Sequence, residues 1–360
     1  MRLGSSALAL FVAGIAPSQT YVVAAAGGPG VNFTSIAAAV AAVPDGAVLL
    51  VRAGTYAGFA INSKGLTVLA DPGVGVQGTI QIINTTATQA VVLRNLEMIA
   101  FIDCLSCAGP VLLDQIGSVP TSGGLLWVRQ CSQVMATSSI FRGGGLQSAV
   151  SVISSQLAFV NSSADVVAPS YGAGIWVNQS GSRVQVVSSV VQTMIGAAIA
   201  VDVGNDVRLL GSSTVTAPPG PNNYAISSYL STVRRASTVS LNGTVQASSM
   251  VTVDDESLSG TGGALGGSVS ATLNGANGNI ALLVLGVTRT PLFLPGIIDS
   301  WWLDPAVSAS VALAVQSGPL TATVPIPPTP ALQGELFGFQ GLFLTPTGLS
   351  MSNPYRFVIH

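Results

Sequence analysis

The segment from Leu125 to Val215 repeats itself with a period of about 24 residues. Each repeat opens with a short apolar strand and carries a pair of serines after a second strand. The openings are Leu126-Trp127-Val128, Val150-Ser151-Val152, Ile175-Trp176-Val177 and Ile199-Ala200-Val201. The serine pairs are Ser138-Ser139, Ser162-Ser163, Ser188-Ser189 and Ser212-Ser213. Two columns that keep one period indicate a solenoid in which each repeat forms one coil.

The residue types in the repeats favour β-strands over helices. Val, Ile, Ser and Thr alternate with a period of two, and the long 3.6-residue periodicity of helical repeats is absent. Equivalent strands of neighbouring coils would then pair in parallel, ~4.8 Å apart. We therefore expect one buried ladder and one stack of serines at a turn. The ladder is Leu126, Val150, Ile175 and Ile199, and the stack is Ser139, Ser163, Ser189 and Ser213.

The low charge of the chain narrows the possible functions. Charged residues make up 7% of the sequence and the formal net charge is −2, which argues against electrostatic binding of nucleic acid. The single histidine, His360, stands at the end of the sequence. Mechanisms that need an internal histidine, including histidine-ligated metals and Ser-His-Asp catalysis, are therefore disfavoured. We expect no cofactor and no metal.

The first residues read as an export signal. Arg2 supplies a positive start, residues 7–15 form a short apolar core, and Ala16-Pro17-Ser18 is a small-residue exit. We expect residues 1–18 to be removed, with a later cleavage within residues 24–26 as the alternative. No segment has the ~18 consecutive apolar residues of a transmembrane span. The expected location is extracellular or at the cell envelope.

Residues 27–70 carry a family resemblance. The relevant stretches are Gly30-Val31-Asn32-Phe33-Thr34-Ser35-Ile36, Ala37 to Val43, Pro44-Asp45-Gly46, Val48 to Tyr56, and Gly65 to Leu69. They resemble the N-terminal end of right-handed parallel β-helix proteins of the pectin-lyase-like superfamily. The resemblance implies a capping helix over Ala37–Val43, with Thr34 or Ser35 as its N-cap, followed by coils that we extend to Ser259.

The chemistry of that superfamily does not carry over with the fold. The Gln-Asp-Thr and Asp-Phe-Ile-Phe-Gly stretches of its methylesterases are absent from this sequence, as is the Arg-x-Pro-x-x-Arg of its lyases. No Asp-Asp pair lies in the regular repeats, where a polygalacturonase would need one.

Two of the three cysteines keep the repeat spacing. Cys107 and Cys131 are one repeat period apart, so neighbouring coils would hold them at a separation that a disulfide accepts. We expect a Cys107–Cys131 disulfide in an exported protein, with two stacked reduced thiols as the alternative. Cys104 aligns with the inward Val128 and is expected to be a buried free thiol.

The pattern changes after Val215. The acidic run Asp254-Asp255-Glu256 is better explained as a solvated turn than as a calcium site. Residues 260–267 include five glycines and are expected to form a linker. The segment 268–360 contains five or six short β-like stretches with Gly and Pro between them, which predicts a small C-terminal β-sandwich. Of Trp301 and Trp302, one is expected in its core, because adjacent strand residues face opposite sides.

Part of this C-terminal segment resembles a module of large bacterial exported proteins. The resemblance rests on Pro325-Ile326-Pro327, Leu332-Gln333-Gly334, Phe339-Gln340 and Leu349 to Asn353.

The repeat alignment also predicts which residues face outward. If Leu126 and Val128 point inward, Trp127 points outward, in one column with Asp103, Ser151, Trp176 and Ala200. The neighbouring outward column is Leu105, Arg129, Ile153, Asn178 and Asp202. Two tryptophans two coils apart would lie ~10 Å from each other, about two sugar units, and indole faces stack on sugar rings. Alternatively, a loop such as Pro169-Ser170-Tyr171 covers them.

These observations favour binding over catalysis. Trp127, Trp176, Arg129, Asn178, Asp202 and Asp103 are the candidate glycan-binding residues. Asp103 and Asp202 would lie four coils apart, ~19 Å, which is too far for a pair of glycosidase carboxylates. We expect a non-catalytic glycan-binding or structural protein of the cell surface or matrix. The alternative is a polysaccharide lyase or glycoside hydrolase of the same fold.

Overall fold

The structure is a computed structural model that describes residues 18–98, 100–118, 125–144, 147–167, 172–293, 297, 300–346 and 348–360. The expected signal peptide falls almost entirely outside these residues. The described chain forms two compact units, Gln19–Val253 and Asp254–His360.

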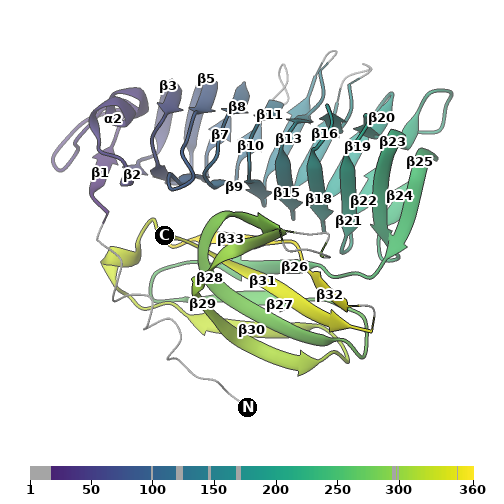
Figure 1. Cartoon of the computed structure of the whole chain (residues 1–360). Helices are drawn as coiled ribbons and strands as arrows, with labels where there is room; N and C mark the ends of the chain where they lie inside the picture. The colour runs from purple at the N-terminus through teal and green to yellow at the C-terminus, as the bar shows by residue number, and fades with distance from the viewer. Residues whose placement is uncertain are drawn as a thin grey trace. The chain divides into compact units, whose positions relative to one another are not determined.

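The first unit is a parallel β-solenoid, as predicted, and it has about eight turns (Figure 1). Each turn contributes strands to three parallel ladders. The first, here called the tryptophan ladder, contains β8 (Phe101–Leu105), β11 (Leu125–Arg129), β14 (Val150–Ile153), β17 (Ile175–Asn178) and β20 (Ala197–Val201).

The second ladder begins at the N-terminal end of the unit. It contains β1 (Thr20–Val23), β2 (Ala47–Val51), β4 (Leu66–Ala70), β6 (Val91–Arg94), β9 (Val111–Asp114), β12 (Val134–Thr137), β15 (Gln156–Val160), β18 (Arg183–Val187) and β21 (Asp206–Leu210).

The third ladder contains the shortest strands. These are β7 (Glu97–Met98), β10 (Gly117–Ser118), β13 (Ile140–Gly143), β16 (Ser163–Val166), β19 (Val190–Thr193), β22 (Thr214–Thr216) and β24 (Ser240–Asn242). Four longer strands bend from one ladder into another: β3 (Gly54–Asn62), β5 (Val74–Ile83), β23 (Tyr224–Ala236) and β25 (Thr244–Val253). The coils therefore continue beyond Val215, to Val253.

The predicted core ladder is confirmed. Leu126 pairs with Val150, Val150 with Ile175, and Ile175 with Ile199, and all four side chains are fully buried. The repeat period therefore corresponds to one strand spacing along the stack, and the inward positions of successive coils form one continuous apolar column.

The predicted serine stack is correct in kind and wrong at one position. The backbone N–H of Ser139 donates to Ser162 Oγ, that of Ser162 to Ser189 Oγ, and that of Ser189 to Ser213 Oγ. Ser162 thus takes the place expected for Ser163, which pairs with Ile140 in β13–β16. The residue before the first three serines of the stack is left-handed (Ser138, Asn161 and Ser188 have φ of 50°, 48° and 47°), whereas in the coil of Ser213 the left-handed residue is Gly211 (φ 62°). In the coil of Ser162, the left-handed position is occupied by Asn161 and not by a serine.

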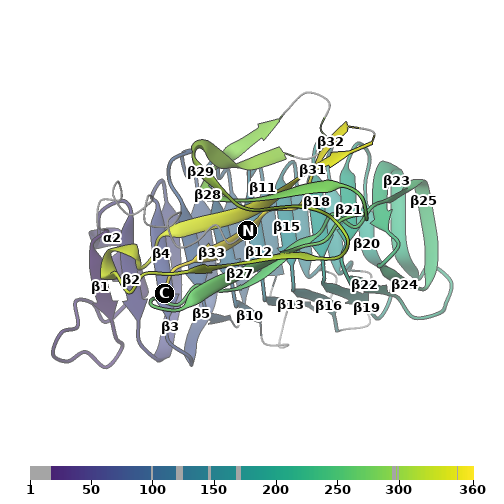
Figure 2. The same ribbon diagram turned by 90° about the horizontal axis from the view of Figure 1, so that it is seen from below.

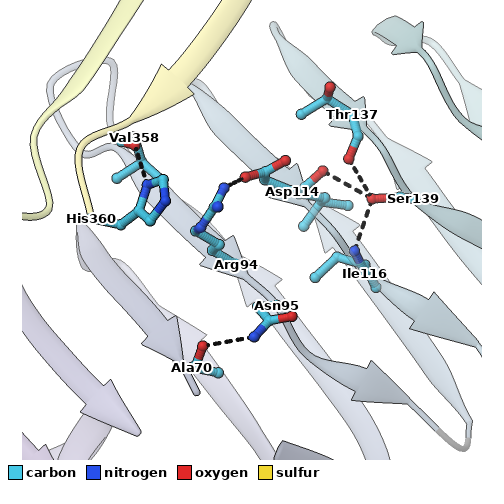
Figure 3. A network of polar contacts seen from close by, with 10 residues as sticks. Ala70, Arg94, Asn95, Asp114, Ile116, Thr137, Ser139, Val358 and His360 are labelled. Atoms are coloured by element: carbon cyan, nitrogen blue, oxygen red, sulfur yellow. Dashed lines mark hydrogen bonds and ion pairs between the residues drawn. The ribbon is translucent and has the colours of Figure 1, made fainter. Parts of the chain in front are cut away.

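The serine hydroxyls form hydrogen bonds with backbone groups at the turn between the second and third ladders. Ser139 Oγ accepts the N–H of Ile116 at 3.0 Å and donates to the carbonyl of Thr137 at 2.8 Å (Figure 3). Such buried hydroxyls satisfy backbone groups that a tight turn removes from the strand ladders. They are structural, in agreement with the turn interpretation of the serine pairs.

The turn between the tryptophan ladder and the second ladder contains a further series of hydrogen bonds, which was not predicted from the sequence. Successive N–H groups donate to Ser155 Oγ, Ser182 Oγ, Asn205 Oδ1 and Ser231 Oγ. The first donor in this series is the backbone of Cys131. The cysteine column is therefore the N-terminal continuation of a corner column of small polar residues.

The predicted capping helix is confirmed as α2 (Ile36–Ala42), the one α-helix among the described residues. Ser35 is its N-cap, and Ile36 and Ala39 are buried. Lys64 Nζ donates to the carbonyls of Val40 and Val43, both at 2.7 Å, and so satisfies acceptors at the C-terminal end of the helix. The helix lies at the end of the solenoid that contains β1 and β2 (Figure 1).

The second unit is the predicted β-sandwich. Its smaller sheet contains β26 (Leu258–Gly262), β27 (Ser268–Leu273) and β30 (Leu320–Pro325). Its larger sheet has the order β29 (Ser300–Val315), β28 (Ile280–Phe293), β31 (Leu336–Thr345) and β32 (Gly348–Met351), and β33 (Tyr355–Val358) also pairs with β31. A 3-10 turn over Pro330–Leu332 precedes β31. All pairings are antiparallel (Figure 1).

The structure corrects the expected linker. Gly260 and Gly262 lie in β26, paired with Ala271 and Val269 of β27, so this glycine-rich segment is a strand and turn of the sandwich. Glycine is required because a Cβ at Gly260 would collide with the ring of Tyr355. Close packing between the sheets, rather than flexibility, therefore explains this composition.

One tryptophan of the pair in β29 is in the core, as expected. Trp302 is buried, while Trp301 is half-buried. The Arg356 guanidinium lies over the Trp302 ring, 4.5 Å from its centroid, and burial lowers the pKa of Arg356 to about 9.

Candidate binding surface

The two predicted outward columns exist in the predicted register. Along the tryptophan ladder Asp103, Trp127, Ser151, Trp176 and Ala200 pair in sequence, and Leu105, Arg129, Ile153 and Asn178 form the adjacent column. Asp202 follows directly after β20. The two indoles are thus two strand spacings apart, ~10 Å. The structure brings all six candidate residues onto one side of the solenoid.

Trp127 is fixed by neighbours on both sides. The ring of Phe101, one coil away, meets it edge-on with centroids 5.2 Å apart, and the Arg129 guanidinium lies 5.2 Å from the indole centroid. Arg129 also makes a two-pronged ion pair with Asp103, through Nη2–Oδ2 at 2.6 Å and Nε–Oδ1 at 3.2 Å. These contacts hold the indole in one orientation and neutralise most of the charge beside it.

Trp176 is fixed differently. Its indole Nε1 donates to Asp202 Oδ2 at 3.1 Å, so a carboxylate orients the ring from its edge. Ser151 stands between the two indoles in the register and is buried, so no large side chain separates the two rings.

Both indoles are half-buried, and this falls short of the full exposure of an open platform. Asn178 is also half-buried, and its Oδ1 accepts the backbone N–H of Gln179 at 2.7 Å. The loop Pro169-Ser170-Tyr171, the alternative cover for the tryptophans, lies outside the described residues.

Phe101 and the pairing of Arg129 with Asp103 were not predicted from the sequence. The signal for both was present, because Phe101 and Leu125 are one repeat period apart and Asp103 aligns with Trp127. A residue at the end of a strand reaches diagonally across to the next coil, so Arg129 meets Asp103 and not its own column neighbour.

Several carboxylates of the solenoid are engaged by an arginine or by an indole, each at a different place. Arg94 pairs with Asp114 (Figure 3), Arg142 with Asp165 and Arg234 with Asp206, in each case between neighbouring coils. Paired acid and base catalysis requires two carboxylates that face one bond. The ladder register separates Asp103 and Asp202 by four coils, which excludes them as such a pair.

The expected disulfide is not formed in the structure. Cys104, Cys107 and Cys131 are all free, buried thiols, so the open alternative of stacked reduced thiols describes this core. A hydrogen bond from the Cys131 thiol lowers the pKa of Cys107 and raises that of Cys131. Burial raises the pKa of the Cys104 thiol. These groups lie inside the stack and not at the surface described above.

The acidic run Asp254-Asp255-Glu256 begins the second unit. Glu256 is buried and accepts a hydrogen bond from Ser350 Oγ, so it joins two segments of the sandwich. Among the described residues, no group of three or more His, Cys, Asp or Glu side chains is placed to hold a metal ion.

Comparisons with known proteins leave the family open. No protein-family model and no curated protein matches the sequence. Among solved structures, the receptor-binding protein of bacteriophage Det7, described as a podoviral tailspike in a myovirus, aligns over 87% of this chain and 73% of its own. The alignment has a TM-score of 0.15 and 10% identity. No helix in the described ranges is both long and apolar enough to cross a membrane.

Proposed function

We propose that this chain is an exported, non-catalytic glycan-binding protein whose binding surface is the outward side of the tryptophan ladder. The observation that carries the proposal is the pair of indoles, Trp127 and Trp176, held in register two coils apart on one sheet. Their spacing of ~10 Å suits two sugar rings of one chain.

The polar groups beside the indoles support this function. Sugars present an apolar ring face and a rim of hydroxyls, so a sugar site combines an aromatic surface with hydrogen-bonding groups around it. Here Asp202 and Asn178 stand beside Trp176, and Arg129 stands beside Trp127. The rings are fixed before a ligand arrives, which lowers the entropic cost of binding.

The charges favour a neutral glycan. Asp103 already neutralises Arg129, and Asp202 adds a negative charge. A uronic acid would therefore meet repulsion without an unpaired cation among the six candidate residues to offset it. We expect neutral polysaccharides to bind more tightly than uronic-acid polymers.

Binding of a panel of neutral and acidic polysaccharides to the purified protein, measured by calorimetry, tests the proposal. Trp127→Ala and Trp176→Ala should each weaken binding by ~1–3 kcal/mol, by analogy with stacking on other planar ligands. Trp301→Ala is the matched control, because Trp301 is also half-buried and lies in the sandwich. Its binding should equal that of the unmodified protein.

Two outcomes would contradict the proposal. If the Trp127 and Trp176 variants bind as tightly as the Trp301 control, the indoles are structural and the surface is not the site. If new reducing ends or unsaturated products appear during incubation, the chain is a hydrolase or a lyase. Assays for both products on the same panel distinguish these cases.

A further inference from the structure

The outer surface of the larger sandwich sheet carries a continuous group of aliphatic side chains. Val315, Ile280, Leu344 and Leu349 pair with one another across β29, β28, β31 and β32, and so form one row. Two residues along each strand, Leu313, Leu282 and Leu342 form a second row. These seven residues are called the aliphatic patch. Their four strands lie side by side (Figure 2).

The patch faces away from the sandwich core. A Cβ at Gly341 would collide with the side chain of Leu273 in the smaller sheet, so Gly341 faces inward. Successive residues of a strand point to opposite faces, so Leu342 and Leu344 point outward. The buried Leu283 and Ala281, which pair with Gly341 and Phe343, place Ile280 and Leu282 on the same outer side.

The patch is unusually exposed for its composition. Five of its side chains are between 41% and 67% exposed: Ile280, Leu349, Leu344, Val315 and Leu313. The strand segments that carry it, residues 280–288, 305–315, 336–345 and 348–351, contain no charged residue. The exposed apolar area is on the order of 500 Å², toward the upper end for the largest patch of a monomer, and such patches are often functional.

We propose that the aliphatic patch is the contact through which two copies of this chain form a homodimer. A two-fold axis places the same surface on both sides of a contact, so a flat patch without charge is complementary to itself. Two copies would bury about 1,000 Å² in total, which is the threshold for a biological interface and corresponds to a weak, reversible dimer. Sheet faces that pack in this way lie ~10 Å apart, with aliphatic side chains interleaved.

The chemistry of the patch favours a second copy over a lipid surface. Segments that bind membrane interfaces combine apolar residues with Trp, Lys or Arg, which reach the headgroups. The aliphatic patch has neither aromatic nor cationic residues. An aliphatic surface of this kind matches the side chains of another sheet.

Sedimentation of the full chain over a range of concentrations tests the proposal. We expect a monomer–dimer equilibrium with a Kd in the micromolar range, as for other small interfaces. The double variant Leu313→Asp, Leu344→Asp should raise the Kd at least about 100-fold, because four carboxylates would enter an apolar contact. Val190→Asp in β19 is the control, since Val190 is 42% exposed and lies in the solenoid. It should dimerise as the unmodified chain does.

Circular dichroism spectra that match the unmodified chain would establish that the variants fold. The proposal is overturned if the unmodified chain stays monomeric to about 100-fold above that Kd range, or if it dimerises and the double variant dimerises equally well. Flotation of the unmodified chain with vesicles of neutral and anionic lipid distinguishes the membrane alternative, and binding there without dimerisation would also overturn the proposal.

Discussion

The two ends of the solenoid differ in whether their last coil is covered. At the N-terminal end the first coils are accompanied by α2, and Ile36 of this helix is 1% exposed. At the C-terminal end β25 is the last strand, and among the described residues it pairs with β23 alone. Eight of the ten residues of β25 are exposed.

The exposure of the last coil follows from the ladder register. Val245 lies over Ile226 and Met250 over Val233, so both belong to inward columns. The residues beneath them are fully buried, whereas Val245 is 39% and Met250 is 38% exposed. An apolar column is covered only where another layer follows. The helix supplies that layer at one end, and nothing in the described solenoid supplies it at the other.

The difference predicts where the solenoid tolerates change. Uncovered strand edges can template pairing with other chains, and β25 contains no charged residue to prevent this. A covered end contributes to stability, and an uncovered end contributes little. Four pairs of substitutions follow from this contrast, and urea unfolding followed by far-ultraviolet circular dichroism measures each of them.

The largest expected effect comes from a charge placed in the cap. Ile36→Asp should lower the free energy of unfolding by about 4 kcal/mol, because a carboxylate would be buried without a partner. Met250→Asp at the open end should lower it by less than about 1 kcal/mol, because water reaches the side chain. Equal losses at the two ends would contradict the contrast.

The next effect concerns the lysine that holds the helix. Lys64→Met keeps the apolar stem and removes two hydrogen bonds to the carbonyls of Val40 and Val43. The expected loss is about 2 kcal/mol, because charged hydrogen bonds are strong and two acceptors lose their donor. Arg235→Met in β23, near the open end, is the control and should change stability by less than about 0.5 kcal/mol. A loss for Arg235→Met as large as that for Lys64→Met would show that Lys64 at the helix contributes no more to stability than Arg235 near the open end.

At the open end a substitution should stabilise the protein. Leu230 has φ of 45° and is 60% exposed, so a bulky residue occupies a left-handed turn position. Leu230→Asn should add about 1 kcal/mol, because asparagine tolerates this conformation. Ser154→Leu, at φ 46° in an earlier coil, should cost a similar amount. If both substitutions leave the unfolding midpoint unchanged, the turn strain is negligible.

The smallest effect distinguishes the two candidate N-caps. Ser35 Oγ accepts the N–H of Ala38 at 3.4 Å. Ser35→Ala should lower stability by about 0.5 kcal/mol, the low end for loss of an N-cap. Thr34→Ala should have no measurable effect, and a larger loss there would assign the cap to Thr34.

The solenoid could be read from the sequence with few errors because its contacts are periodic. Each residue of a coil meets its equivalent in the next coil, so a spacing of one repeat period becomes a direct neighbour in space. Trp127 and Trp176 were therefore placed in one column correctly. The error at Ser163 arose where coils differ in length, because a count along the chain does not show which residue takes the left-handed turn position.

The contacts of the candidate site were less predictable. Register placed Asp103 beside Trp127, but the diagonal pairing of Arg129 with Asp103 depends on side-chain reach. The hydrogen bond from Trp176 to Asp202 depends on how the chain leaves β20. The half-burial of the indoles depends on neighbours such as Phe101, which a single column does not include.

The sequence by itself determined the parallel stack, its inward and outward columns, the capping helix and the existence of a second β unit. Each of these follows from periodicity or from local residue preferences, which act over short distances along the chain. Only the tertiary structure decided that Gly260 belongs to a strand, that the three cysteines are free thiols, and that seven aliphatic residues of four strands form one patch. Those features depend on pairings between segments far apart in the chain, where sheet register and side-chain packing, and not local preference, set the neighbours.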